Sequence, residues 1–191
     1  MRILITLVVF FLFTQALGQE KRERQKKIKS HQMPSGTLEL LRQSMPDLKK
    51  VRYYEETDGD NLSYEAKFQF QKRFFSVEFS KEGLLEDVEV KISYKNLPSP
   101  LRNQIEHYLK QESEIFKVIK AQKQYKHTGT DPQTTLVIAL QEGESEAIFF
   151  ELEVDMNKGK GWSSYEILFD RNGRFVSKRR IVTRSLDNLL Y

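Results

Sequence analysis

The sequence predicts an α+β fold: a duplicated helix-plus-four-strand antiparallel meander, with each helix packed on one face of a curved sheet. Three observations predict it. A strand–turn–strand pattern at residues 75–85 returns at residues 165–175, and each copy ends its polar turn in glycine. Runs of alternating polar and apolar residues mark the strands, and two stretches with apolar residues at helical spacing precede them.

The first residues have the composition of a secretory signal peptide. Arg2 precedes an apolar run from Ile3 to Phe13, and the segment ends in the small-x-small pattern Ala16-Leu17-Gly18. Such a run is short for a bilayer-spanning helix. We therefore expect residues 1–18 to be a signal peptide that is cleaved near Gly18, and the protein to be exported to the periplasm or beyond the cell. Residues 19–36 are rich in Lys and Arg, which predicts a disordered basic linker.

Residues 37–95 form the first predicted unit. Thr37 is a candidate helix cap, and Pro46 is a candidate helix end. Four strand-like runs follow, at 51–55, 64–70, 75–79 and 84–92. The turn at 80–83 ends in Gly83, which suits a positive φ.

Residues 96–183 form the second predicted unit. Leu97-Pro98 begins an amphipathic helix that continues to about residue 110. Strand-like runs follow at 115–125, 135–140, 147–154, 164–169 and 174–182. The run at 135–140 has no counterpart in the first unit, so we expect an extra strand there. Residues 184–191 are expected to be a C-terminal tail. The sequence leaves open whether the two units share one sheet or form two sheets side by side.

No catalytic or metal-binding motif stands out. Cysteine is absent, which excludes disulfides, thiolate ligands and a cysteine nucleophile. The three histidines, His31, His107 and His127, lack the spacing of a metal site. The carboxylates fall on polar strand positions among lysines, where cross-strand charge pairs account for them. We therefore expect a protein that is not an enzyme and has neither a cofactor nor a metal.

Aromatic residues at strand starts and turns are the candidate partner-binding residues. Exposed Trp and Tyr side chains often anchor protein contacts. Trp162 lies beside a Gly-Lys-Gly tip, which makes it the strongest candidate. The predicted partner-binding residues are Tyr53, Tyr54, Lys160, Trp162 and Tyr165.

The motifs, taken in order, resemble a known family. A helix leads through Met45-Pro46 to Val51 and a tyrosine pair, residues 64–68 read Tyr-Glu-Ala-Lys-Phe, and Leu97-Pro98 joins the two halves. Together they resemble the PepSY-like and beta-lactamase-inhibitor-protein-like (BLIP-like) secreted proteins of Bacteroidota, over residues 37–182. The pattern departs from the family in two places: Tyr53 or Tyr54 stands where the usual tryptophan would be, and the second half carries extra residues at about 126–146. The resemblance implies a BLIP-like tandem repeat and an exported protein, and it implies no reaction.

The function that we expect is that of an exported, non-enzymatic binding or modulating protein, acting through the polar face of its sheet on a protein of the periplasm or cell envelope. One alternative is an inhibitor of, or protector against, a secreted hydrolase. Another is a cell-envelope protein tethered by its basic N-terminal tail, with Lys21–Lys29 making weak electrostatic contact with an anionic membrane surface. An enzyme acting on envelope polymers is the last alternative. Nucleic acid is not an expected partner, because no basic face with aromatic stacking positions stands out.

Overall fold

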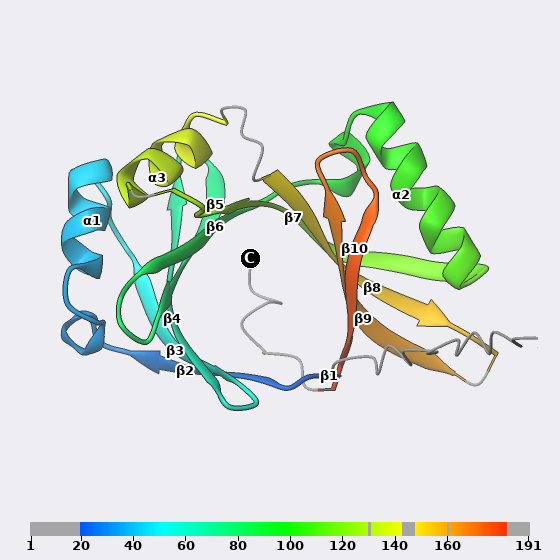
Figure 1. The fold of residues 1–191 in the computed structure, drawn as a ribbon, viewed down its shortest axis with the longest axis horizontal. Helices are drawn as coiled ribbons and strands as arrows, with labels where there is room; N and C mark the ends of the chain where they lie inside the picture. The colour runs from blue at the N-terminus through cyan, green and yellow to red at the C-terminus, as the bar shows by residue number, and fades with distance from the viewer. Residues whose placement is uncertain (1–19, 130, 143–147, 160, 183–191) are drawn as a thin grey trace, which may run out of the picture.

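The computed structural model of the chain describes residues 20–129, 131–142, 148–159 and 161–182. Within them, ten strands form one sheet and three α-helices lie on its outer side (Figure 1). The predicted signal peptide at 1–18, its cleavage near Gly18 and the tail at 184–191 lie outside the described residues. The fold is therefore α+β, as the sequence predicts.

The first half of the chain supplies six strands and one α-helix. They are β1 (Glu20–Lys21), β2 (Glu23–Ile28), the 3-10 helix η1 (Ser30–Gln32), α1 (Thr37–Ser44), β3 (Arg52–Asp58), β4 (Asn61–Phe70), β5 (Arg73–Ser80) and β6 (Leu85–Lys91). All four strand-like runs predicted between 51 and 92 correspond to strands, β3 to β6. Thr37 does not cap α1, because Gly36 is the N-cap and the Thr37 hydroxyl donates to the carbonyl of Pro34 at 2.8 Å.

The second half supplies four strands and two α-helices. They are the 3-10 helix η2 (Tyr94–Asn96), α2 (Ser99–Glu112), β7 (Ile115–Lys126), α3 (Pro132–Leu140), β8 (Ile148–Asn157), β9 (Trp162–Asp170) and β10 (Phe175–Ile181). Each half thus has a helix followed by four consecutive strands, with α3 inserted after β7. That this order arose by duplication stays a prediction, as do the two unit boundaries.

The strand order decides between one sheet and two. The order is β1-β10-β9-β8-β7-β6-β5-β4-β3-β2, and β6 pairs with β7, so both halves share one sheet. At one edge β1 pairs in parallel with β10, and at the other β2 pairs with β3. Only Arg22 separates β1 from β2. One continuous segment therefore pairs with both edges and closes the sheet into a ring, with six residues paired to β3 and two residues paired to the end of β10.

The apolar core lies between the helices and the outer, convex face of this ring. Every second strand residue points outward, and on β5 these outward residues include Phe79, which is fully buried. The helices cover them with Leu41 of α1, Ile105 of α2 and Leu136 of α3, all at most 2% exposed. Burying a side chain of this size contributes about 1.5–3 kcal/mol. The polar strand residues consequently face the inside of the ring.

The two repeated turns have the geometry that their glycines predict. Gly83 has φ +85° and Gly173 has φ +79°. The N–H of Gly83 donates to the carbonyl of Ser80, and that of Gly173 to the carbonyl of Asp170, at 2.9 Å in both cases. Both turns are therefore confirmed.

The prediction of a disordered basic linker at 19–36 is wrong. Residues 23–28 pair with β3 in register from Glu23 opposite Asp58 to Ile28 opposite Tyr53. Glu23 and Ile28 are buried. The high charge of this segment predicted disorder, but Lys21 pairs with Glu23 and Glu166 inside the ring, and the backbone of residues 23–28 completes the ladder of β3.

The prediction of a strand at 135–140 is also wrong, because this run belongs to helix α3. Asp131 caps the helix, since its carboxylate accepts from the backbone N–H groups of Gln133 and Thr134, and Pro132 occupies the first turn. A short run that is apolar on all sides does not distinguish a buried strand from a buried helix by periodicity. Asp131 and Pro132, at the start of the run, are the residues that indicate a helix.

Candidate functional site

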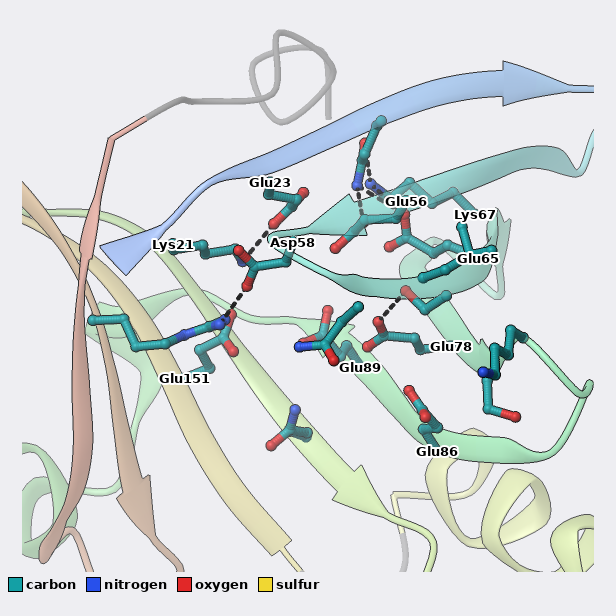
Figure 2. Close-up of a pocket in the computed structure, with 18 of the residues that line it drawn as sticks. Lys21, Glu23, Glu56, Asp58, Glu65, Lys67, Glu78, Glu86, Glu89 and Glu151 are labelled. Atoms are coloured by element: carbon teal, nitrogen blue, oxygen red, sulfur yellow. Dashed lines mark hydrogen bonds and ion pairs between the residues drawn. The ribbon is translucent and has the colours of Figure 1, made fainter. Parts of the chain in front are cut away.

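The polar face of the sheet encloses a cavity of about 500 Å³. Alternation along the strands places the side chains that line it, for example Ser63, Glu65 and Lys67 on β4. Figure 2 shows that they come from the N-terminal segment and from strands on both sides of the ring. Carboxylates outnumber cations among the lining residues by ten to five. The carboxylates are Glu23, Glu56, Asp58, Asp60, Glu65, Glu78, Glu82, Glu86, Glu89 and Glu151, and the cations are Lys21, Lys67, Lys81, Lys120 and Arg179.

Ion pairs hold the ring closed at one side of the cavity. Arg179 of β10 donates to Glu166 of β9 at 2.7 Å and to Asp58 at the β3–β4 turn at 2.5 Å. Lys21 contacts Glu23 at 2.5 Å and also pairs with Glu166. Burial alone would raise the pKa of Glu166, but the charges of Lys21 and Arg179 hold it below its usual value. These contacts join the N-terminal segment, β9, β10 and the β3–β4 turn.

A second group of carboxylates lies across the cavity without a cation in contact. Glu56 accepts a hydrogen bond from Gln25 at 2.7 Å, and Glu78 accepts one from Ser63 at 2.8 Å. Burial and the neighbouring Glu23, Glu65 and Glu78 raise the pKa of Glu56 to about 9. Burial and Glu65 raise the pKa of Glu78 to about 7.

Glu89 of β6 belongs to the same group. Within the described part of the chain, its carboxylate has no hydrogen bond or ion pair. Burial raises the pKa of Glu89 to about 7 against the opposing charge of Lys120, and Glu78 adds to the rise. At neutral pH this side of the cavity is therefore poised between protonated and ionised carboxyl groups.

Two buried oxygen atoms behind this group lack partners among the described residues. Gln124 of β7 donates to Asp87 of β6 at 2.9 Å through Nε2, while Oε1 of Gln124 and Oδ1 of Asp87 have no hydrogen bond. Gln124 lines the cavity and is only 7% exposed. An unpaired buried acceptor costs about 1–3 kcal/mol, so these atoms favour a hydrogen-bond donor at this position.

The structure separates the predicted partner-binding residues. Tyr53 packs against the outer core, whereas Tyr54 points into the ring and is buried, with its ring centroid 5.2 Å from Nζ of Lys67. Trp162 and Tyr165 are three residues apart on β9 and so point to opposite faces. Trp162 is 57% exposed. Lys160 lies outside the described residues.

These residues do not make one surface, because Tyr53 and Tyr54 point to opposite faces of β3, and Trp162 and Tyr165 point to opposite faces of β9. Tyr54 forms part of the inner wall of the ring, whereas Tyr53 and Tyr165 pack against the apolar core. Nζ of Lys158 and of Lys178 lie 5.7 and 5.5 Å from the ring centroid of Tyr165. A role for any of the five in partner binding stays a prediction.

Sequence reasoning identified the polar face but not the cavity. Glu78, Glu89 and Glu151 were expected to form cross-strand charge pairs, and in the described chain none of the three forms an ion pair; Glu151 accepts a hydrogen bond from Gln122 at 3.1 Å. The signal was present in the excess of carboxylates over lysines on this face. This excess of carboxylates indicates a cavity only because residues 20–28 close the ring, and local sequence patterns do not reveal that closure.

Metal binding and membrane insertion find no support in the described residues. They contain no grouping of three or more His, Cys, Asp or Glu side chains suited to hold a metal ion. No helix among them has the length and apolar character to cross a membrane.

Comparisons with known proteins identify the fold. No protein-family model matches the chain, and a comparison with curated protein sequences gives no significant match. Solved structures do match. A BLIP-like protein from Bacteroides fragilis is 16% identical with a TM-score of 0.51, covering 81% of this chain and 90% of its own. A DUF2874 family protein from Bacteroides ovatus is 13% identical with a TM-score of 0.54, covering 78% of this chain and 88% of its own.

A third structure, from Bacteroides eggerthii and described provisionally as periplasmic, is 13% identical with a TM-score of 0.54. The match covers 82% of this chain and 94% of the Bacteroides eggerthii chain. At these identities the likeness concerns the fold alone. The chain thus has a BLIP-like fold, which confirms that part of the resemblance noted from the sequence motifs.

Proposed function

We propose that the protein is an exported, non-enzymatic binding protein that acts through the inner, polar face of its closed sheet. One observation carries the proposal: this face encloses a cavity of about 500 Å³ with an excess of carboxylates. Ligand cavities in proteins are of this order of size. The signal-like first residues and the fold shared with a protein described provisionally as periplasmic support export.

The enclosed geometry favours a small ligand, or an inserted side chain, over a flat protein surface. Residues 20–28 close the ring, and the Arg179 contacts to Asp58 and Glu166 hold that closure. The flat surface of a folded partner could not lie against the inner face while this segment closes the ring. A hydrolase inhibitor that used the concave face in this way would need the ring to open, so the inhibitor alternative ranks second.

Native mass spectrometry tests the proposal. Residues 19–191, incubated with envelope and culture-supernatant extract, should retain a small molecule as a non-covalent complex. Ser63→Trp places an indole in the cavity wall and should abolish retention. The matched control, Trp162→Ala, removes an exposed aromatic from the end of β9 and should leave retention unchanged.

Two outcomes would overturn the proposal. One is a folded wild-type chain that retains no small molecule. The other is retention that Ser63→Trp preserves and Trp162→Ala abolishes, which would move the binding surface to the exposed aromatic at the end of β9. Circular dichroism and thermal unfolding show whether each variant is folded.

A further inference from the structure

We propose that the cavity binds a small organic polycation, namely an aliphatic oligoamine with two or more protonated amino groups. This inference rests on the proposed function and names the chemical class of its ligand. It is carried by the charge of the cavity, by a buried acceptor that lacks a donor, and by the size and apolar margin of the cavity.

The first argument is charge. All five cations that line the cavity already contact carboxylates: Lys21 with Glu23, Lys67 with Glu65, Lys81 with Glu82, Lys120 with Glu153, and Arg179 with Asp58. Among the described residues, Glu56, Glu78 and Glu89 have no cation within ion-pair distance. An ammonium group placed between Glu78 and Glu89, whose carboxyl groups ionise at about pH 7, would supply the missing opposite charge in a site that water screens weakly.

The second argument is hydrogen bonding. Oε1 of Gln124 is buried without a donor, and Gln124 lies directly opposite Glu89 in the β6–β7 register. An ammonium group carries three donors and no acceptor, so it suits a wall of carboxylate and amide oxygens. One amino group could therefore meet Gln124 and Glu89 together, while a second reached Glu78 on the next strand.

The third argument is size and shape. A bare metal ion would leave most of the 500 Å³ empty, and the described residues offer no three-ligand grouping for one. A smaller hollow of about 50 Å³ shares Glu65, Lys67 and Glu89 with the cavity and is lined by Phe74. The methylene groups between the amines can lie against this aromatic ring while the charged ends remain among the carboxylates.

Isothermal titration calorimetry with spermidine, a linear triamine, tests the inference on residues 19–191. At about pH 8, above the pKa of Glu78 and Glu89, spermidine should bind with one-to-one stoichiometry. Butylamine, 1,4-butanediol and maltotriose serve as probes with a single charge or none, and each should bind at least about tenfold more weakly. Tenfold corresponds to about 1.4 kcal/mol, of the order of one desolvated charge pair.

Variants show whether binding occurs in the cavity. Glu78→Gln and Glu89→Gln should each weaken spermidine binding about tenfold. Glu114→Gln is the matched control, because Glu114 is an exposed carboxylate between α2 and β7, outside the cavity lining. The affinity of this variant for spermidine should equal that of the wild type. Thermal unfolding of each variant verifies the fold, which the loss of a repelled buried carboxylate should not weaken.

Three results would overturn the inference: no spermidine binding, equal affinity in all three variants, or preferential binding of maltotriose. If the chain retains a small molecule in native mass spectrometry but fails to bind spermidine, the proposed function stands and the oligoamine assignment fails. If it retains nothing and binds nothing, both fail.

Discussion

At the residue scale, the interior carboxylates divide into two classes by their neighbours. The charges of Lys21 and Arg179 stabilise the ionised form of Glu166, so they lower its pKa despite burial. Glu56, Glu78 and Glu89 lie among other carboxylates, so burial and repulsion raise their pKa values. The same residue type, at equivalent inward positions, thus acts as a structural ion-pair partner on one side of the cavity and as a titrating group on the other.

This division predicts how stability depends on pH. Glu89 has a pKa of about 7 in the folded chain and an ordinary, lower value in the unfolded chain. Between these values the folded chain holds the extra proton, so the stability associated with Glu89 decreases as the pH rises from about 4.5 to about 7. Glu78, Glu65, Lys120 and Lys21 are the charged groups whose fields act on it.

The measurement is thermal unfolding of the wild type and of Glu89→Gln at about pH 5 and about pH 8. The variant should match the wild type at pH 5 and exceed it by about 1–3 kcal/mol at pH 8, because glutamine carries no charge at either pH. Glu114→Gln should follow the wild type at both values. A variant that is less stable than the wild type at pH 8 would contradict the pKa assignment.

Two glycines with positive φ form a matched pair for a second prediction. A Cβ on Gly173 would lie 3.0 Å from Cδ1 and 3.1 Å from the carbonyl oxygen of Leu101, whereas a Cβ on Gly59 would meet nothing within 4 Å. Gly59→Ala should cost about 1 kcal/mol from backbone strain alone. Gly173→Ala should cost about 2–3 kcal/mol, because the turn must also move away from α2. Urea unfolding measures both, and equal costs would show that α2 does not press on this turn.

At the element scale, the segment of β1 and β2 decides the shape of the binding face. It pairs with β10 through two residues and with β3 through six, so most of its backbone contact lies on the β3 side. The short β1–β10 ladder is reinforced by side chains, above all by Arg179. The β10 side is therefore the weaker join of the ring.

Arg179 and Arg180 test this join, because they are neighbours on β10 and differ in direction. Arg179 points inward to Asp58 and Glu166, and Arg180 is exposed. Arg179→Met should lower the free energy of unfolding by about 2–4 kcal/mol, since it leaves Glu166 with fewer partners in a buried position. Arg180→Met should change it by less than about 0.5 kcal/mol.

Hydrogen exchange locates the effect. In Arg179→Met the amides of β1 and β10 should exchange faster than in the wild type, while those of β4 and β5 keep their relative protection. Uniform acceleration across the whole sheet would mean that Arg179 supports global stability without acting as a local join.

At the scale of the whole molecule, the pairing of β6 with β7 makes the two halves one cooperative structure. The helices of both halves cover the same convex face, and α3 from the second half contacts α1 and β6 from the first. We expect a single unfolding transition in calorimetry, with the calorimetric and van't Hoff enthalpies equal. Amides of β4 and β9 should share the same exchange free energy. Two separate transitions would show that the halves unfold as independent domains.

The sequence by itself determined the positions of α1, α2 and eight of the strands, the two glycine turns and the division of each strand into polar and apolar sides. These features depend on local periodicity and backbone preference, which neighbouring residues encode. The sequence also named Tyr54 and Trp162 as candidate partner-binding residues, which stays a prediction, and it did not show where either side chain would lie.

The tertiary structure alone decided that residues 20–28 join the sheet, that 135–140 is helical, and that the polar face encloses a cavity. Closure depends on contacts between Lys21 and Glu166 and between Asp58 and Arg179, which are 145 and 121 positions apart. Pairing at such separations depends on the whole fold, because the charged N-terminal segment meets its partners only when the other edge of the sheet lies beside it. The same event turns a solvent-facing row of carboxylates into a buried one and so creates the candidate binding site.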